Sequence, residues 1–382
     1  MSSVIDAAAG AVERMRRLYA GELLPDDVVE AFSTPSAAFA TRNVRHGTPA
    51  PLPSGSALLP ADLAIPGEGR SHDLVDYVSR NRVAGLLILV DGCVALEQYQ
   101  LGMDPGTRWL SMSIAKSVST TLVGAAVHAG LIGSVDEPLA RYVKELVGTT
   151  YEGVTIRQVL MMASGVRWDD THTDAASERR AMLELQLQQS PGAIVRYVGS
   201  RGRAAPPGTT WNYSTGETHL VGALVRAATG QWLSEYLSER IWRPAGMESD
   251  ASWWLESPGG LEVAGSGLLA TLRDYARFGQ FVLDDGVIDS NRVLPEGWMR
   301  AAAGPSQVNG QRVDYGYMWW PVPGSDGLDT DGAFSARGIF GQYLYVNPRR
   351  RLVIVSLCAR SKPKGAEAIA DNDFFNAVAD AL

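Results

Sequence analysis

The chain has 382 residues, of which 46% are hydrophobic and 20% charged, as in a soluble globular protein with one large domain or two closely packed domains. Its formal net charge of −8 gives no indication of the basic surface that nucleic acid requires, and no apolar run reaches the roughly 18 residues of a transmembrane helix. Residues 1–24 lack the apolar segment of a signal peptide, so we expect a cytoplasmic protein with neither nucleic-acid nor membrane partners.

The first strands are expected after an extended arm. Residues 33–70 are rich in Pro, Ser, Gly and Ala, a composition typical of a segment that wraps a surface. Two β-rich runs then flank Asp91–Gly92, and this pattern predicts a hairpin because both turn positions tolerate a positive φ. Cys93 and Cys358 lie in apolar stretches, which predicts free thiols rather than a disulfide.

The middle of the chain is rich in helical patterns. The segments are TIRQVLMMASG (155–165), SERRAMLELQLQQS (177–190), GETHLVGALVRAATG (216–230) and QWLSEYLSERIW (231–242). The last two form a helix pair interrupted at Gly230, a residue typical of a helix end.

The C-terminal region returns to strands. GQYLYVNP (341–348) and LVIVSLCA (352–359) predict a second hairpin, and NDFFNAVADAL (372–382) predicts a closing helix. Strands at both ends without a βα alternation predict an α+β fold, in which an antiparallel sheet flanked by helices is built from both chain ends. We expect this α/β domain to comprise residues 1–148 and 268–382, and an all-helical inserted domain to comprise 149–267.

One lysine lies in an otherwise small and apolar helical segment, RWLSMSIAKSVSTTLVGAAV (108–127). Ser113 precedes Lys116 by three positions, so both lie on one helix face. A lysine whose pKa is lowered by burial can take the proton of a serine hydroxyl and make it a nucleophile. The alternative is a surface lysine near a capping serine, and S-x-x-K also occurs at Ser361–Lys364, where Pro363 disfavours a helix.

Two further segments offer groups that would complete such a site. Tyr213 follows a Pro-Pro-Gly turn and precedes a helix starting near Thr215, so its hydroxyl can point into a cleft and relay protons. The segment SARGIFGQYLYVNP (335–348) can present a backbone N–H that forms an oxyanion hole with the N–H of Ser113. For Tyr213, the alternative is an aromatic side chain packed beneath a helix. For residues 335–348, the alternative is a β-bulge or a turn.

Other chemistries lack their motifs. The chain contains no G-x-S-x-G elbow, no H-E-x-x-H, no Cys/His cluster and no glycine-rich phosphate loop after a strand. The five histidines are scattered along the sequence. We therefore expect neither a metal nor another cofactor.

Taken in order, several segments together resemble the serine β-lactamase and penicillin-binding-protein superfamily, in its class C-type branch. They are SMSIAKS, TIRQVLMMASGV, PPGTTWNYSTGETHLVG, RPAGM, GSGLLATLRDYARFG and GQYLYVNPRRRLVIVSL. Within that branch, SMSIAKS and the turn GIFGQ look most similar to the 6-aminohexanoate-dimer hydrolases and related carboxylesterases. The resemblance implies hydrolysis through an acyl-enzyme without a cofactor.

The resemblance also implies roles for individual residues. Ser113 resembles the acylated nucleophile, Lys116 its general base, and Tyr213 the group that moves a proton to the leaving group. The third motif of the family falls on residues 336–338, which makes the N–H of Ile339 the second oxyanion donor beside that of Ser113.

The same comparison implies a set of substrate contacts. In such relatives the loop WDDTHTD reaches over the active site, so Trp168, Asp170 and His172 are candidate contacts; a solvent-facing polar loop is the alternative. Thr215 occupies a position where many relatives carry asparagine. The third motif lacks the Lys or His that helps bind a β-lactam carboxylate in relatives, and Arg337 stands near that position. Both departures favour an ester or a linear amide over a lactam.

The sequence therefore predicts a serine hydrolase that acts on a small-molecule ester or linear amide. The second hypothesis is a β-lactamase or D-amino-acid peptidase, and the third is a non-catalytic ligand-binding member of the same fold. The intact set of Ser113, Lys116 and Tyr213 favours an enzyme. The oligomeric state stays open between a monomer and a homodimer.

Overall fold

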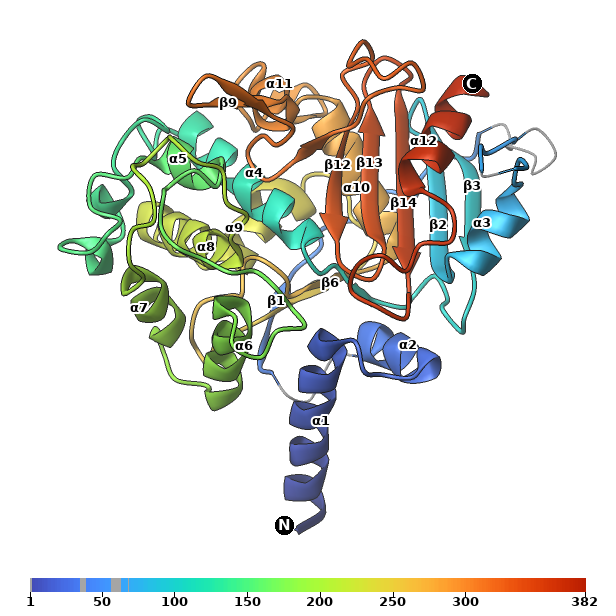
Figure 1. The fold of residues 1–382 in the computed structure, drawn as a ribbon. Helices are drawn as coiled ribbons and strands as arrows, with labels where there is room; N and C mark the ends of the chain where they lie inside the picture. The colour runs from blue at the N-terminus through green and yellow to red at the C-terminus, as the bar shows by residue number, and fades with distance from the viewer. Residues whose placement is uncertain (1, 35–38, 56–62, 68) are drawn as a thin grey trace.

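A six-stranded antiparallel sheet forms one half of the molecule (Figure 1). The structure is a computed structural model, which describes residues 2–34, 39–55, 63–67 and 69–382. The strands of the sheet, in spatial order, are β11 (Trp320–Pro321), β12 (Phe334–Gly338), β13 (Gln342–Asn347), β14 (Leu352–Cys358), β2 (Val83–Val90) and β3 (Cys93–Tyr99). Because β14 pairs with β2, both chain ends build the sheet, as the sequence predicts.

Helices cover both faces of this sheet, which explains why its central strands are apolar throughout. Successive side chains of a strand point to opposite faces, so Leu87 and Leu89 belong to one core while Leu86 and Ile88 belong to the other. The helices on the two faces are α10 (Leu272–Leu283) and α4 (Ile114–His128) on one side, and α3 (Leu74–Arg80) and α12 (Asp371–Asp380) on the other.

Both predicted hairpins are present. The turn between β2 and β3 has positive φ at Asp91 (+51°) and Gly92 (+76°), which is the backbone geometry that favours an Asp-Gly pair. The second hairpin joins β13 to β14 through Pro348–Arg351.

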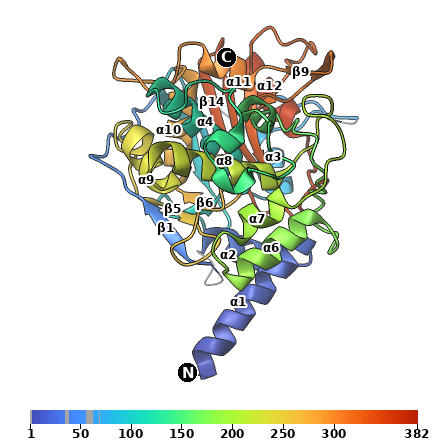
Figure 2. The same ribbon diagram turned by 90° about the vertical axis from the view of Figure 1, so that its left-hand side faces the viewer.

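The other half of the molecule is largely helical (Figures 1 and 2). Its helices are α5 (Ile156–Leu160), α6 (Glu178–Gln188), α7 (Ala193–Gly199), α8 (Thr215–Thr229), α9 (Leu233–Leu237) and the π-helical turn Ser238–Trp242. Beyond Trp242 the predicted all-helical range 149–267 also contains a strand, β5 (Ala251–Trp254), because its four residues pair with β1 (Thr41–Val44). The division into two domains stays a prediction.

β5 belongs to a four-stranded sheet of order β1-β5-β6-β4, with β6 (Leu268–Ala270) and β4 (Trp109–Leu110). Other short elements are the 3-10 helices Leu139–Arg141 and Lys144–Leu146, α11 (Trp298–Ala303), β7 (Val287–Ile288), β8 (Asn291–Arg292), β9 (Ser306–Val308) and β10 (Gln311–Val313).

Two N-terminal helices precede the arm and were not anticipated: α1 (Ser2–Ala20) and α2 (Pro25–Ser33). Much of α1 projects away from the body of the protein, as Figures 1 and 2 both show. The predicted arm lies partly outside the described residues. Within the described ranges, no helix is both long and apolar enough to cross a membrane.

Candidate active site

Ser113 stands at the start of α4, directly after strand β4. Met112 adopts φ +45°, a left-handed conformation that residues other than glycine seldom take, and the bend brings Ser113 to the wall of a cavity. The N–H of Ser111 donates to the carbonyl of Leu268 at 2.8 Å, which anchors this bend to β6. The Ser113 side chain is nearly buried, at 8% exposure.

Lys116 lies one helical turn further along, with its amine directed at Ser113. Its Nζ is 2.9 Å from Ser113 Oγ and 2.9 Å from the carbonyl oxygen of Gly265. The predicted i, i+3 contact is thus present. A methyl group at Gly265 would lie 3.3 Å from Lys116 Nζ, so a larger residue there would crowd the amine.

The environment of Lys116 favours the neutral amine. Burial lowers the pKa of Lys116 from 10.5 to about 7, and the charges of Arg179 and Lys364 act in the same direction while Asp170 opposes them. At neutral pH a large fraction of the molecules therefore hold a lysine able to accept a proton from Ser113.

Tyr213 completes the triangle from the segment that precedes α8. Its ring centroid lies 5.2 Å from Lys116 Nζ. Burial raises the pKa of Tyr213 above its ordinary value, and a hydrogen bond with Ser113 opposes that rise. The ring is held among aromatic neighbours with centroids 6.0–6.4 Å away, namely Trp211, Tyr315 and Trp320. The structure thus brings Ser113, Lys116 and Tyr213 together from distant parts of the chain.

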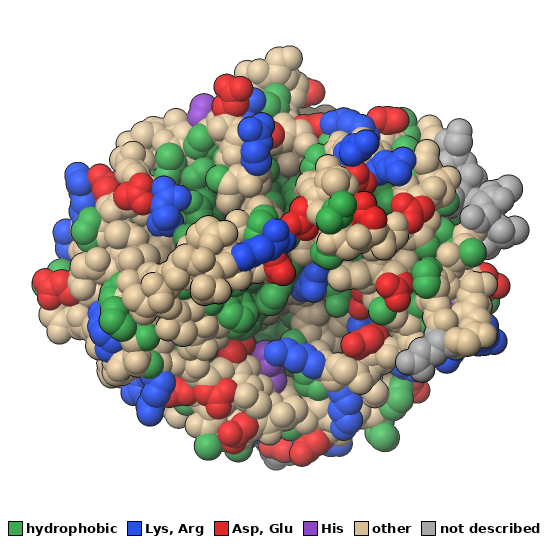
Figure 3. Space-filling model, turned by 45° about the horizontal axis from the view of Figure 1, so that its top comes forward, with side chains coloured by type: hydrophobic (Ala, Val, Ile, Leu, Met, Phe, Trp, Pro, Cys, Tyr) green, Lys and Arg blue, Asp and Glu red, His purple; other side chains and the backbone are tan. Residues whose placement is uncertain are grey.

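The cavity beside Ser113 has a volume of about 500 Å³ and contains Gly338 and Ile339 at the end of β12. A side chain at Gly338 would place its Cβ 2.6 Å from the carbonyl oxygen of Ser111, so only glycine lets β12 approach the start of α4 this closely. The main chain of Ile339 therefore lies next to the candidate nucleophile. On the face in Figure 3, hydrophobic side chains gather in a central hollow bordered by charged residues.

Arg337 also lines this cavity. Its Nε donates to Ser335 Oγ at 2.8 Å, and its guanidinium carbon lies 5.3 Å from the ring centroid of Trp320. Burial lowers the pKa of Arg337. The guanidinium thus has a fixed position on the cavity wall.

A second compartment of about 580 Å³ adjoins the first and is walled by the loop 168–173. Trp168, Asp170 and His172 line it, as do Lys362, Pro363 and Lys364 from a loop after β14. The two compartments share wall residues, which are His172, Trp211, Tyr213, Pro363 and Lys364. Together they form one elongated cleft. Lys364, which ends the second S-x-x-K sequence, thus lies at the cleft, although residues 361–364 form no helix.

Most hydrogen-bonding capacity of Asp170 is used within the protein. Its Oδ1 accepts from Trp168 Nε1 at 2.7 Å and from the N–H of Thr215 at 2.8 Å, while Oδ2 accepts from Thr215 Oγ1 at 3.1 Å. His172 Nε2 lies 4.0 Å from Oδ2. Thr215 is buried and lines neither compartment. Asp170 therefore ties the loop to the start of α8, directly after Tyr213.

A buried carboxyl group lies in the first turn of α8, shortly after Tyr213. Glu217 accepts hydrogen bonds from Ser164 Oγ and from Tyr151 Oη, the latter at 3.4 Å. Burial raises the pKa of Glu217 from 4.5 to about 8, so it is protonated at neutral pH. The sequence pattern gave no indication of this group.

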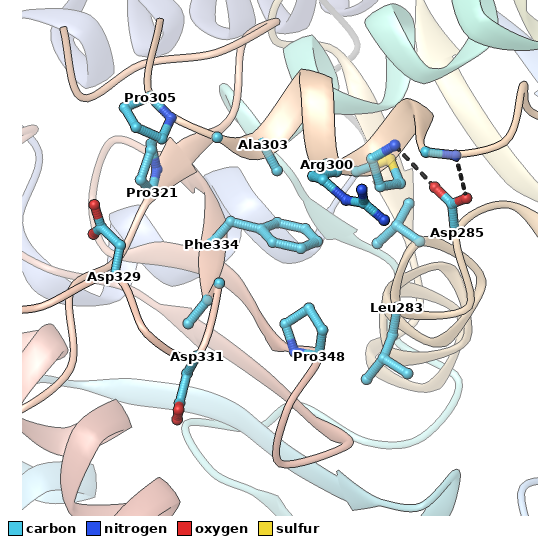
Figure 4. A pocket seen from close by; sticks show the side chains of 16 residues that line it. Leu283, Asp285, Arg300, Ala303, Pro305, Pro321, Asp329, Asp331, Phe334 and Pro348 are labelled. Atoms are coloured by element: carbon cyan, nitrogen blue, oxygen red, sulfur yellow. Dashed lines mark hydrogen bonds between the residues drawn. The ribbon is translucent and has the colours of Figure 1, made fainter. Parts of the chain in front are cut away.

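A separate cavity of about 380 Å³ lies between α10, α11 and β12 (Figure 4). Its wall combines apolar residues such as Phe334 and Leu283 with Arg300 and three aspartates. Asp285 accepts from the N–H groups of Gly297 and Met299. Among the residues that the structure describes, the wall contains no Ser, Thr, Cys, Lys, His or Tyr, so this cavity has no counterpart of the Ser113–Lys116 pair. Across the described ranges, no group of three or more His, Cys, Asp or Glu could hold a metal ion.

Residues 74–376 match the family model described as Beta-lactamase. The chain belongs to the Beta-lactamase family. A 6-aminohexanoate-dimer hydrolase from Paenarthrobacter ureafaciens is 30% identical over 311 residues, which cover 77% of this chain and 77% of the relative.

Solved structures of the Beta-lactamase fold agree with the architecture. A Bacillus anthracis protein, provisionally named a 6-aminohexanoate-dimer hydrolase, superposes with a TM-score of 0.75 at 24% identity, covering 90% of this chain and 89% of that one. A family VIII carboxylesterase superposes with a TM-score of 0.61 at 14% identity, covering 81% and 95%. At these identities the structures show the fold alone. The resemblance inferred from sequence and the predicted fold class are therefore confirmed, and the family's relatives include hydrolases of amide and ester bonds.

Proposed function

We propose that this protein is a serine hydrolase that cleaves an ester or a linear amide through an acyl-enzyme on Ser113. The observation that carries the proposal is the 2.9 Å contact between Ser113 Oγ and Lys116 Nζ, with a lysine pKa of about 7. A neutral amine at that distance can take the hydroxyl proton as the oxygen attacks a carbonyl carbon.

The remaining steps use groups on the same cavity wall. The backbone N–H groups of Ser113 and Ile339 hold the oxyanion of the tetrahedral intermediate. Tyr213 passes a proton from Lys116 to the leaving alcohol or amine, whose bond to the carbonyl carbon then breaks. Water attacks the acyl-enzyme, and its proton returns through the same groups to release the acid and restore Ser113.

The shape of the cleft supports an extended substrate with apolar portions. Two adjoining compartments meet at Tyr213, and aromatic rings of Trp211 and Trp320 form part of the walls. Trp168, His172 and Arg337 are proposed to contact the substrate. Asp170 and Thr215 were also expected to bind substrate, but they bond to each other, so we propose that they hold the loop in place instead. The chemistry requires no cofactor, and we propose a cytoplasmic location.

The test compares wild type with Ser113→Ala on three substrates: p-nitrophenyl butyrate, the linear 6-aminohexanoate dimer and a cephalosporin. We expect cleavage of the ester or the dimer by wild type, loss of that cleavage in the variant, and an acyl adduct on Ser113 by intact mass. Cleavage of the cephalosporin alone would favour the β-lactamase hypothesis. If wild type left all three intact and formed no adduct, the protein would be a ligand-binding member of the fold.

A further inference from the structure

The C-terminal end of α1 reaches the cleft, although this helix precedes the family match at residue 74. The ring of Tyr19 stacks on His172, with centroids 5.9 Å apart and planes inclined by 8°. Arg179 covers Tyr19, its guanidinium carbon lying 4.4 Å from the ring centroid. All three side chains are at least nine-tenths buried. Tyr19 therefore belongs to the packing behind the cleft wall.

Gly21, two residues after Tyr19, contacts a second segment of the cleft wall. The carbonyl oxygen of Gly21 accepts from Lys362 Nζ at 2.6 Å, and a Cβ at Gly21 would lie 2.9 Å from Pro363 Cδ. The carbonyl oxygen of Pro363 in turn accepts from the N–H of Phe340 at 3.0 Å, next to Ile339. One short stretch, residues 19–21, thus contacts both loops that wall the cleft.

His172 and Pro363 line both compartments, so they stand at the boundary between them. They are two of the five side chains shared by both compartments, so a shift of either would alter the passage from Ser113 to the loop compartment. Burial lowers the pKa of His172 to about 3, although the nearby negative charge of Asp170 acts to raise it. The imidazole is therefore neutral near pH 7. The passage is therefore controlled by the position of the ring rather than by its charge.

We propose that Tyr19 is a positioning residue that, through His172, keeps the passage between the two compartments open and so allows long substrates to bind. This proposal rests on the proposed function, because it concerns the substrate length that the same cleft accepts. A short substrate needs only the compartment beside Ser113. A substrate extended on both sides of its carbonyl needs the passage as well.

The chain offers a matched pair of variants. Tyr19 Oη is buried and has no hydrogen-bond partner among the described residues, so Tyr19→Phe keeps every contact of the ring. Tyr19→Leu keeps an apolar side chain but removes the stack on His172. Arg16→Gln serves as a control for general loosening of α1, because it removes the ion pair with Glu184 at 2.7 Å without a change at the cleft.

The assay measures kcat and KM for ethyl acetate and for pentyl pentanoate by pH-stat. We expect Tyr19→Leu to raise KM for pentyl pentanoate about five- to tenfold, the range of an aromatic contact, while kcat and the KM for ethyl acetate change less than about twofold. Tyr19→Phe and Arg16→Gln should match wild type. A loss that is equal for both esters, or no loss, would overturn the proposal.

A second readout does not depend on catalysis. Hydrogen exchange of the backbone amides of residues 168–173 should be faster in Tyr19→Leu and unchanged in Tyr19→Phe. Equal exchange in all variants would overturn the positioning role even if the chemistry of Ser113 is established. If wild type cleaved no ester or amide, the proposed function and with it the length selectivity would fail, while the exchange rates would still decide whether Tyr19 positions the loop.

Discussion

The pKa of Lys116 can be converted into an expected pH dependence of acylation. An ordinary lysine with a pKa of about 10.5 is neutral in about one molecule in 3000 at pH 7. With a pKa of about 7, half of the molecules hold the neutral amine at that pH. Burial therefore increases the population of enzyme with a competent base by about a thousandfold at neutral pH.

The neutral amine is the form that accepts the proton, so kcat/KM should rise with pH. We expect about a tenfold increase per pH unit below pH 7 and a plateau above it. The assay follows p-nitrophenyl butyrate at a wavelength where p-nitrophenol and its anion absorb equally. A flat profile, or a midpoint near that of an ordinary lysine, would refute the assignment of Lys116 as the base.

The charges that face Lys116 supply an internal check. Arg179 and Lys364 lower its pKa and Asp170 raises it, while Tyr213 beside it is neutral. Lys364 is exposed, and Lys364→Gln removes its positive charge. The pKa of Lys116, and with it the midpoint of the pH profile, should therefore move to higher pH. Lys364→Arg keeps the charge and should leave the midpoint in place. A shift to lower pH in Lys364→Gln would contradict this electrostatic account.

Three other variants test separate parts of the structure. Tyr213→Phe should lower amide cleavage more than ester cleavage in parallel kcat measurements, because an amine leaves only when protonated; equal losses would count against the relay. Gly338→Ala places a Cβ 2.6 Å from the Ser111 carbonyl oxygen and should displace Ile339. We expect kcat to fall by about 100-fold while the circular dichroism spectrum stays unchanged. A wild-type kcat would mean that β12 can move away from the start of α4 without a loss of activity. Glu217 has a pKa of about 8 in the folded protein, against an ordinary value of 4.5, so its contribution to the free energy of unfolding is lost as pH rises between these values. Protonating it at pH 7 costs about 3 kcal/mol, so Glu217→Gln should raise the free energy of unfolding in urea by up to that amount at pH 7 and by much less at pH 5. The same change at both pH values would contradict the assignment.

Local sequence signals predicted the parts of the site that depend on local geometry. Ser113 and Lys116 are neighbours because of helix periodicity, and the Asp91–Gly92 turn follows from backbone conformation. The position of Tyr213 before α8 was also clear, because a turn and a helix start leave recognisable residues.

The contacts that tune the site could not be predicted in the same way. Lys116 donates to Gly265, Asp170 binds Thr215, and Tyr19 stacks on His172, and each pair is far apart in the sequence. No periodicity connects such residues, because only the packing of separate helices and loops brings them together. Helix α1 was not predicted either, although Met15, Leu18 and Tyr19 are spaced so that they lie on one helix face.

The pairing of β2 with β14 also determines when the sheet is able to form during synthesis. Val90 pairs with Leu352, so one edge of β2 lacks its partner strand until residues 352–358 have been made, whereas the other edge pairs with β3. Until then β2 exposes an apolar edge that favours association with other chains. Because Gly338 ends β12 of this sheet, the proposed oxyanion site should take shape only after β14 has joined β2.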